Sequence, residues 1–322
     1  MDVSAETTTQ KGRFQFSYMG DGGDMALLML KNLFFTIITL GIYRPWAKTN
    51  MRRYIWENVK FMGDGGTYVG TGKELFRGWM KLFGLIVVLV VVSKALETLL
   101  PVLKIPLAII VPFFYVFVFA IATYSGLRYR LSRTLWRQIR FGVDKDEAST
   151  KEFIKLYLKG VLFSILTLGF YYSIFRNKVR TYLTNRSRLG SAYFKYDGTD
   201  DDYFKLYCKG LFLSIITLGI YSPWFMANLI KFRLKHTSFQ NARFEFTMAG
   251  KDVFIYGLVA YFGAIFSFGL AVPWIFSWGL RKITENIYVE GELDLNSIRQ
   301  RASDGSAMAD DIVAEYDLDL GF

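Results

Sequence analysis

The sequence predicts an all-α integral membrane protein made of tandem helical-hairpin repeats, with short β-strand segments in the cytoplasmic linkers between hairpins. The composition is 52% hydrophobic and only 21% charged, which is too apolar for a disordered chain. Three long stretches carry no charged residue, and acidic residues recur at a regular spacing. We therefore expect residues 1–322 to form a single membrane domain.

The charge-free stretches carry the membrane prediction. They cover residues 105–127, 210–230 and 253–280. A bilayer core of about 30 Å takes roughly 20 helical residues, so each stretch is long enough to cross it. The alternative is a soluble helical protein, but helices in such proteins rarely run this far without a charge. The N-terminus has no apolar segment followed by a cleavage site, so we expect no cleaved signal peptide.

The repeat is the most specific signal in the sequence. Aligned acidic residues mark five units: Asp24, Glu74, Glu152, Asp202 and Asp252. Their spacings are 50, 78, 50 and 50, so the second unit carries 78 − 50 = 28 additional residues. The predicted units are roughly 14–60, 61–140, 141–190, 191–240 and 241–290, followed by an acidic tail over 291–322.

Each unit has the pattern of a short aromatic strand, a Gly/Asp turn, a helix, a break and a second helix. The acid falls in the first turn of the first helix, where a carboxylate suits the positive end of the helix dipole. A Thr-Leu-Gly segment ends this helix, and Pro-Trp opens the next, because glycine tolerates positive φ and proline fits a first turn. The predicted turn residues are Gly41, Pro45, Trp46, Gly169, Gly219, Pro223, Trp224, Gly269, Pro273 and Trp274. A continuous helix kinked at proline is the alternative.

The charged linkers distinguish two topologies. Six single spans would leave nearly equal numbers of basic residues on the two sides, which the positive-inside rule disfavours. Hairpins with both ends on one side gather the basic linkers together and leave only Lys104 and Arg44 near the tips. We therefore predict a multi-pass protein whose linkers and strand segments lie in the cytoplasm, where the strands can pair into a small sheet.

Hairpin length differs between the units. Arms of about 17 residues reach roughly 25 Å, so four hairpins extend part-way across the bilayer or thin it. The longer second unit crosses completely. Lys94 and Glu97 lie near its far end and are predicted to form an intramembrane ion pair, with an ion pathway as the alternative role.

A belt of basic residues is the candidate binding site. Positions three and seven residues after the acid share one face of the first helix, and the second helices carry further cations at comparable depth, Arg130 and Arg180 among them. The candidate anion- or lipid-binding residues are Lys31, Arg52, Arg53, Arg77, Lys81, Lys155, Lys159, Lys205, Lys209, Lys231, Arg233 and Arg281. Two interpretations stay open: lysines that extend to the membrane interface, or recognition of anionic head groups at the cytoplasmic leaflet.

Several other activities are disfavoured. Cys208 and His236 are the only residues of their types, which excludes a disulfide framework and a thiolate or multi-histidine zinc site. The glycine-rich segment 20–23 lacks the Lys-Ser/Thr of a phosphate loop and is interpreted as a turn. We expect no catalytic residues, no metal, no cofactor and no enzymatic activity. Nucleic acid is not an expected partner, because the basic residues flank membrane segments.

Two segments carry a family resemblance. Residues 39–46 have the sequence Thr-Leu-Gly-Ile-Tyr-Arg-Pro-Trp, which returns nearly unchanged at 217–224, and residues 68–76 carry a second motif. These segments resemble the YjgN family of bacterial inner-membrane proteins, a family of unknown function. The resemblance implies a location in the bacterial cytoplasmic membrane and supplies no catalytic or binding residues.

These observations favour a structural or regulatory membrane module whose basic belt binds anionic lipid or a membrane partner. The acidic tail over 291–322 is expected to be solvated or to dock on a partner protein. The alternative function is a transporter or channel for a small anionic solute, with its path between the repeats.

Overall fold

The strand segments belong to a barrel. The computed structural model describes residues 10–144 and 147–300, and this part of the chain contains ten strands. They are β1 (Gln10–Tyr18), β2 (Val59–Phe61), β3 (Asp64–Tyr68), β4 (Thr134–Trp136), β5 (Ile139–Val143), β6 (Ser187–Leu189), β7 (Ala192–Tyr196), β8 (Thr237–Phe239), β9 (Asn241–Phe246) and β10 (Ile287–Leu293). All pairs are antiparallel in the order β1-β10-β9-β8-β7-β6-β5-β4-β3-β2, and the barrel closes because β2 also pairs with β1.

The predicted all-α class is therefore wrong. The sequence indicated one strand before each helix pair, but each unit also carries a second strand after that pair, and the two sets alternate around the barrel. Closure leaves no sheet edge with unpaired backbone groups. Alternate residues of each strand point inward, so Phe14 and Phe16 pack on the core while Lys11 and Arg13 stay exposed.

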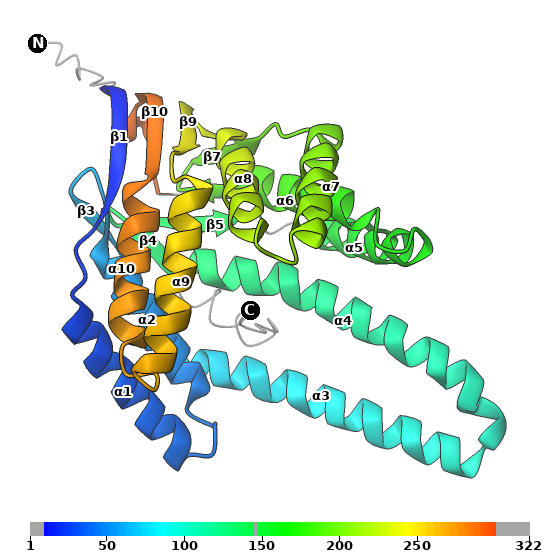
Figure 1. The fold of residues 1–322 in the computed structure, drawn as a ribbon. Helices are drawn as coiled ribbons and strands as arrows, with labels where there is room; N and C mark the ends of the chain where they lie inside the picture. The colour runs from blue at the N-terminus through cyan, green and yellow to red at the C-terminus, as the bar shows by residue number, and fades with distance from the viewer. Residues whose placement is uncertain (1–9, 145–146, 301–322) are drawn as a thin grey trace, which may run out of the picture.

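Ten α-helices leave the barrel in pairs within the described ranges. They are α1 (Gly22–Ile38), α2 (Arg44–Asn58), α3 (Gly72–Leu99), α4 (Lys104–Ser132), α5 (Glu147–Leu166), α6 (Tyr172–Arg186), α7 (Asp200–Ile216), α8 (Ser222–Lys235), α9 (Gly250–Phe266) and α10 (Val272–Glu285). A short 3₁₀ turn, η1 (Pro101–Leu103), joins α3 to α4. A second, η2 (Leu295–Ser297), follows β10. The second helix of each pair packs on the first helix of the next, and α10 packs on α1 (Figure 1).

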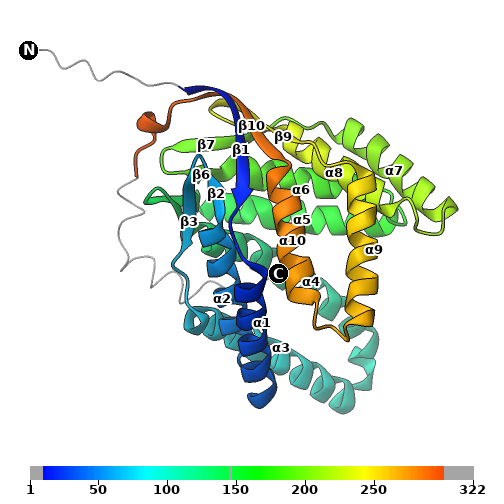
Figure 2. The ribbon, with the colours of Figure 1, turned by 60° about the vertical axis from the view of Figure 1, so that its left-hand side comes forward.

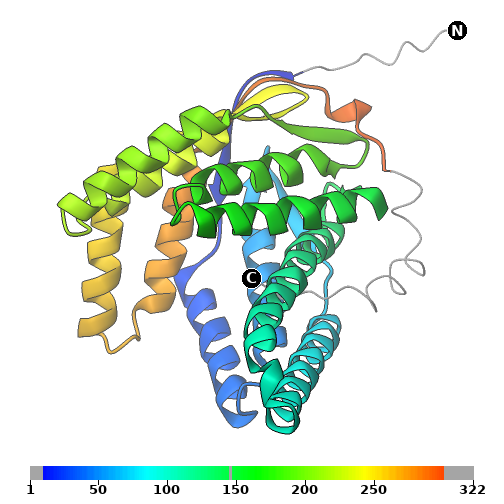
Figure 3. The same cartoon turned by 90° about the vertical axis from the view of Figure 1, so that its right-hand side faces the viewer.

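The order of elements places every helix pair at the same end of the barrel. Each odd-numbered strand leads into the first helix of a pair, and each even-numbered strand follows the second helix of a pair. Because neighbouring strands are antiparallel, all strand–helix junctions lie at one rim. The tight strand turns, together with the outer ends of β1 and β10, lie at the other (Figures 2 and 3). The helices therefore extend from one side only.

The two helices of each short pair are separated by a repeated turn. In the first pair, Gly41 has φ +92° and its N–H donates to the Thr36 carbonyl at 2.7 Å. The Thr39 hydroxyl accepts from the Tyr43 N–H at 3.0 Å and so links the two helices. Gly169, Gly219 and Gly269 adopt the same positive φ. Pro45, Pro223 and Pro273 stand in the first turn of α2, α8 and α10, so the chain forms two helices there rather than one kinked helix.

Close packing within the pairs depends on helical glycines. A β-carbon added at Gly210 of α7 would overlap the ring of Phe225 on α8, and Gly160 meets Phe175 in the same way. A β-carbon added at Gly257 of α9 would meet no atom within 4 Å.

We expect Gly210→Ala and Gly257→Ala to change stability in opposite directions. Overlap with Phe225 should destabilise Gly210→Ala by about 1–3 kcal/mol. Gly257→Ala should stabilise by up to about 1 kcal/mol, because alanine is the better helix former. Denaturant unfolding of both variants in detergent measures the difference. Equal effects would show that the close contact between α7 and α8 is not formed.

Candidate functional site

The tips of the short helix pairs expose large apolar side chains. Leu40, Leu168, Leu218 and Phe268 directly precede the turn glycines and are 94%, 91%, 93% and 96% exposed. Each also adopts a positive φ of 50–51°, which costs a residue with a β-carbon about 1–2 kcal/mol. Fully exposed leucine and phenylalanine at four equivalent tips form the kind of apolar surface that marks a contact with a membrane or with another protein.

The exposed lysines of the first helices lie at a fixed distance from these tips. Lys31, Lys159 and Lys209 each stand nine residues before the tip residue of their pair. At 1.5 Å per residue this separation is about 12–14 Å, close to half of a hydrocarbon core of about 30 Å. For a helix that stands along the bilayer normal, a tip at the middle of a bilayer would place these ammonium groups near the head-group boundary.

The second helix pair is longer and lacks such a tip. Residues 72–99 and 101–132 form the two helices of the described chain that are long and apolar enough to cross a membrane, and only 11% and 17% of their most apolar windows are buried. Low burial distinguishes them from core helices of a soluble protein. Figure 1 shows this pair, α3 and α4, extending well beyond the others. The Lys94 ammonium lies 2.8 Å from Glu97 Oε2, so the predicted ion pair is present on α3.

The predicted basic belt separates into two groups. Lysines and arginines of the first helices are exposed; these are Lys31, Arg77, Lys81, Lys155, Lys159, Lys205 and Lys209. Three arginines of the second helices instead contact the next unit. Arg53 donates to the Gly70 carbonyl at 3.4 Å and Arg281 to the Gly20 carbonyl at 3.2 Å. Arg52 donates to the Tyr68 hydroxyl at 3.4 Å. These three arginines therefore join neighbouring units. Arg233 contacts Tyr203 within its own unit, and Lys231 is half-buried.

Three arginines surround a cavity of about 280 Å³ among the helices. Arg176 and Arg180 come from α6 and Arg233 from α8, and Tyr203 of α7 completes the polar wall. Burial, and next the neighbouring Arg233, hold the pKa of the Arg180 guanidinium below its ordinary value. Arg233 donates to the Tyr203 hydroxyl at 2.7 Å and Arg176 to the Tyr172 hydroxyl at 3.3 Å. Within residues 10–144 and 147–300, no carboxylate is paired with any of the three.

The sequence identified these arginines only in part. Arg233 belongs to the predicted belt and Arg180 was noted for its depth, whereas Arg176 was missed. The available signal was the spacing of four between Arg176 and Arg180, which places both on one face of α6. Convergence with α8 depends on the packing of three helices, and no local pattern reveals it.

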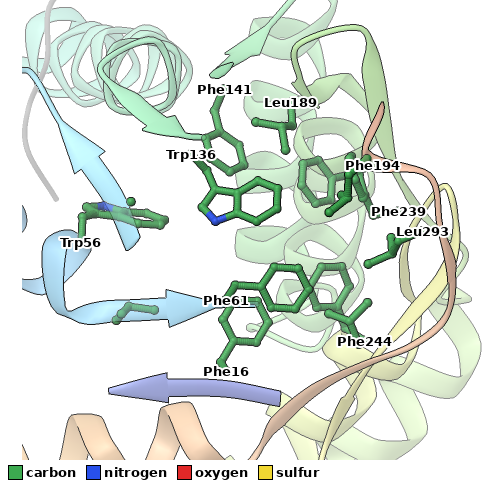
Figure 4. A pocket seen from close by; sticks show the side chains of 14 residues that line it. Phe16, Trp56, Phe61, Trp136, Phe141, Leu189, Phe194, Phe239, Phe244 and Leu293 are labelled. Atoms are coloured by element: carbon green, nitrogen blue, oxygen red, sulfur yellow. The ribbon is translucent and has the colours of Figure 1, made fainter. Parts of the chain in front are cut away.

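The barrel interior is a second cavity, but it carries no polar chemistry. Figure 4 shows aromatic rings from strands all round the barrel, including Phe61, Trp136 and Phe244, pointing toward one another. Phe16 and Phe61 stack with ring centroids 4.5 Å apart, and the remaining volume is about 90 Å³. An apolar void of this size stays dry, so we interpret it as the packed core of the barrel.

No metal site is evident in the described part of the chain. It contains no group of three or more His, Cys, Asp or Glu side chains that could hold an ion. Cys208 is half-buried and carries no disulfide. The glycine-rich segment is a helix start: Asp21 Oδ2 accepts from the Gly23 N–H at 2.6 Å and the Asp24 N–H at 3.2 Å, and these bonds lower the pKa of Asp21.

The predicted tail begins as part of the barrel. Residues 291–293 complete β10, where Glu292 pairs with Lys11 at 3.0 Å. The segment then crosses the far rim: the Asp294 N–H donates to Gln240 and the Arg299 N–H to Ser191. Residues 301–322, on which the partner prediction rests, lie outside the described residues.

An ion-pair cluster stands on the outer wall of the barrel. Asp197 Oδ1 lies 2.8 Å from His236 Nδ1, and its other oxygen lies 2.7 Å from Arg243. Partial burial opposes ionisation of Asp197, but the hydrogen bonds from Arg243 and His236 outweigh it and lower the pKa of this carboxyl.

We expect Asp197→Asn to lower stability by about 0.5–1 kcal/mol at neutral pH, the upper range for exposed ion pairs. Because the folded pKa is lowered, this contribution is present above the ordinary value of 3.8 and is lost as the pH falls through the lowered value. Unfolding of both proteins in detergent across this range should show the two curves converging in acid. Glu57→Gln, at an exposed acid without a described ion pair, is the control and should show no such convergence. A constant difference at all pH values would contradict the assignment.

Comparison with known proteins gives a family match and partial matches to relatives. A family model described as "Bacterial protein of unknown function (DUF898)" matches residues 13–201, 192–255 and 224–314. The inner membrane protein YjgN of Salmonella typhimurium is 39% identical over 66 residues, which is 20% of this chain and 17% of that protein. The inner membrane protein YjgN of Escherichia coli O157:H7 is 31% identical over 127 residues, 39% of this chain and 30% of that protein. The matched segments thus span less than a third of these relatives. No solved structure matches the chain.

Proposed function

The chain belongs to the DUF898 family of bacterial proteins of unknown function, and we propose its role from the geometry of its helix pairs. Its resemblance to the YjgN family is thereby confirmed, and the relatives' name supports an inner-membrane location. The proposed role is that of a structural or regulatory membrane module. Its short hairpins dip into the cytoplasmic leaflet, its long hairpin crosses the bilayer, and its first-helix lysines bind anionic head groups.

One observation carries this proposal: the equal separation between exposed lysines and exposed apolar tips. Lys31, Lys159 and Lys209 stand nine residues from Leu40, Leu168 and Leu218, respectively. In the long pair, Lys81 occupies the same position after its acid. It lies 19 residues before Leu100, which caps the end of α3 at the tip of that pair. That is about 28 Å, close to a whole hydrocarbon core. One membrane position therefore places all four lysines at the same interface.

The transporter alternative has less support. A solute path needs polar groups through the whole core. Between residues 82 and 127, which contain most of the long hairpin, the charged residues are Lys94, Glu97 and Lys104. Lys94 and Glu97 neutralise each other, and Lys104 lies at the tip.

The lysine register can be tested with spin-labelled lipids. Lys159→Gln/Lys209→Gln removes two cations from the proposed interface. Lys195→Gln/Lys235→Gln removes two exposed cations near the barrel and is the matched control. A basic residue near an anionic surface is worth about 1 kcal/mol, so preference for the anionic lipid should fall about fivefold per lysine.

The readout is the selectivity of the reconstituted protein for phosphatidylglycerol over phosphatidylcholine in the immobilised lipid shell. We expect the interface variant to lose selectivity and the control variant to keep it. Equal loss in both variants, or in neither, would contradict the proposed register of lysines and head groups.

A further inference from the structure

The cavity among α6, α7 and α8 holds an unusual concentration of uncompensated charge. Arg176, Arg180 and Arg233 all line it, and no described carboxylate is paired with them. Arg180 makes no hydrogen bond with any described residue, and its nearest aromatic partner is the Tyr196 ring, 6.0 Å from its guanidinium carbon. Arg176 is exposed and Arg180 and Arg233 are half-buried, so three like charges repel one another across one cavity, and a bound anion would offset that repulsion.

The remaining polar groups of the cavity narrow the ligand chemistry. Asn177 cannot serve as a ligand, because its amide donates to the Gly198 carbonyl and Asp200 while its oxygen accepts from Tyr196. Tyr203 accepts from Arg233, and its own hydroxyl hydrogen has no acceptor in the described part of the chain. Thr184 and Ser187 also line the cavity, and the Ser187 hydroxyl donates to the Leu183 carbonyl at 2.8 Å. Charged donors therefore dominate the lining: guanidinium N–H groups, together with one phenol O–H.

Donors of this kind match a tetrahedral oxyanion. The planar guanidinium fork binds two oxygens of a phosphate at once, which a lysine ammonium does not do. The volume of about 280 Å³ is many times the ~10–15 Å³ that a single water needs. A phosphate group with part of its substituent or hydration shell fits this space.

Depth along the helix agrees with a membrane source for the phosphate. Arg180 stands eleven residues after the turn glycine Gly169, about 16 Å from the hairpin tip at 1.5 Å per residue. With the tip at the bilayer centre, this position lies at the head-group boundary.

We propose that Arg176, Arg180, Arg233 and Tyr203 form a phosphate-binding site between the helix pairs, which takes a phospholipid head group or a free phosphate. The lipid source rests on the proposed membrane insertion of the hairpins, whereas binding of free phosphate does not. This site is distinct from the exposed lysines, which contact the surrounding lipid.

The test compares the full chain with Arg180→Gln/Arg233→Gln and with the control Lys195→Gln/Lys235→Gln. Thermal unfolding is followed in neutral detergent with phosphate against chloride at equal ionic strength. It is then followed in phosphatidylcholine nanodiscs with and without phosphatidylglycerol. We expect ligand to raise the Tm of the wild type and the control, and the arginine variant to lose affinity at least about tenfold.

A second readout separates binding from folding. Without ligand, Arg180→Gln/Arg233→Gln should unfold at a higher temperature than the wild type, because it removes the repulsion between two half-buried like charges that face one cavity. The conservative Arg180→Lys/Arg233→Lys keeps the charge but loses the fork, and should bind phosphate more weakly than the wild type. A variant more stable without ligand and insensitive to it cannot be explained by misfolding.

The outcomes distinguish the ligand sources. Stabilisation by phosphate and by phosphatidylglycerol, lost in the arginine variant, supports a site for the phosphate group itself. Stabilisation by phosphatidylglycerol alone, lost in the same variant, supports a lipid head-group site. Equal stabilisation of wild type and arginine variant, or none in either condition, overturns the proposal. The lysine selectivity test is unaffected by that result, so the two proposals fail separately.

Discussion

Closure of the barrel is the constraint on which the rest of the structure depends. Its strands are joined alternately by a tight turn and by a helix pair, and all neighbours are antiparallel. Every helix pair must then leave from the same rim, whatever its length. The longer second pair extends farther without changing the barrel. Its additional residues lie between β3 and β4, and these two strands still pair antiparallel, as the other neighbours do. The barrel thereby sets a common starting level for all five hairpins.

Because all helix pairs start at one rim, the length of each pair determines how far it extends from the barrel. Four tips expose a leucine or phenylalanine in a left-handed conformation, an arrangement that is unfavourable in water. Transfer of such a side chain into hydrocarbon contributes roughly 1.5–3 kcal/mol, which exceeds the conformational cost of about 1–2 kcal/mol. Three of these hairpins carry a lysine nine residues before the tip, and the long hairpin carries Lys81 nineteen residues before Leu100. In the proposed membrane position these separations are about half and about all of a hydrocarbon core. Apolar reach and charge placement therefore describe the same membrane position.

The sequence predicted local features and missed those that depend on distant pairing. The Thr-Leu-Gly turn and the following proline can be predicted because glycine and proline act through their own backbone angles, as Gly41 and Pro45 show. Strands such as β4 and β6 have only three residues, too few for an alternating pattern. Closure requires β1 to pair with β10, some 280 residues away, and no local signal encodes that contact. Arg176 was missed for the same reason, since its partners come from other helices.

Sidedness of the barrel tests this account most directly. Single cysteines in a Cys208→Ala background, at the strand-turn positions Met62, Arg137 and Gln240 and at the tip residue Leu218, would be challenged with a membrane-impermeant thiol reagent. We expect the three turn positions to react only after the inner membrane is opened, and Leu218→Cys, buried in lipid, to react in neither condition. Turn positions that label from opposite sides, or a Leu218 position that labels in intact cells, would contradict it.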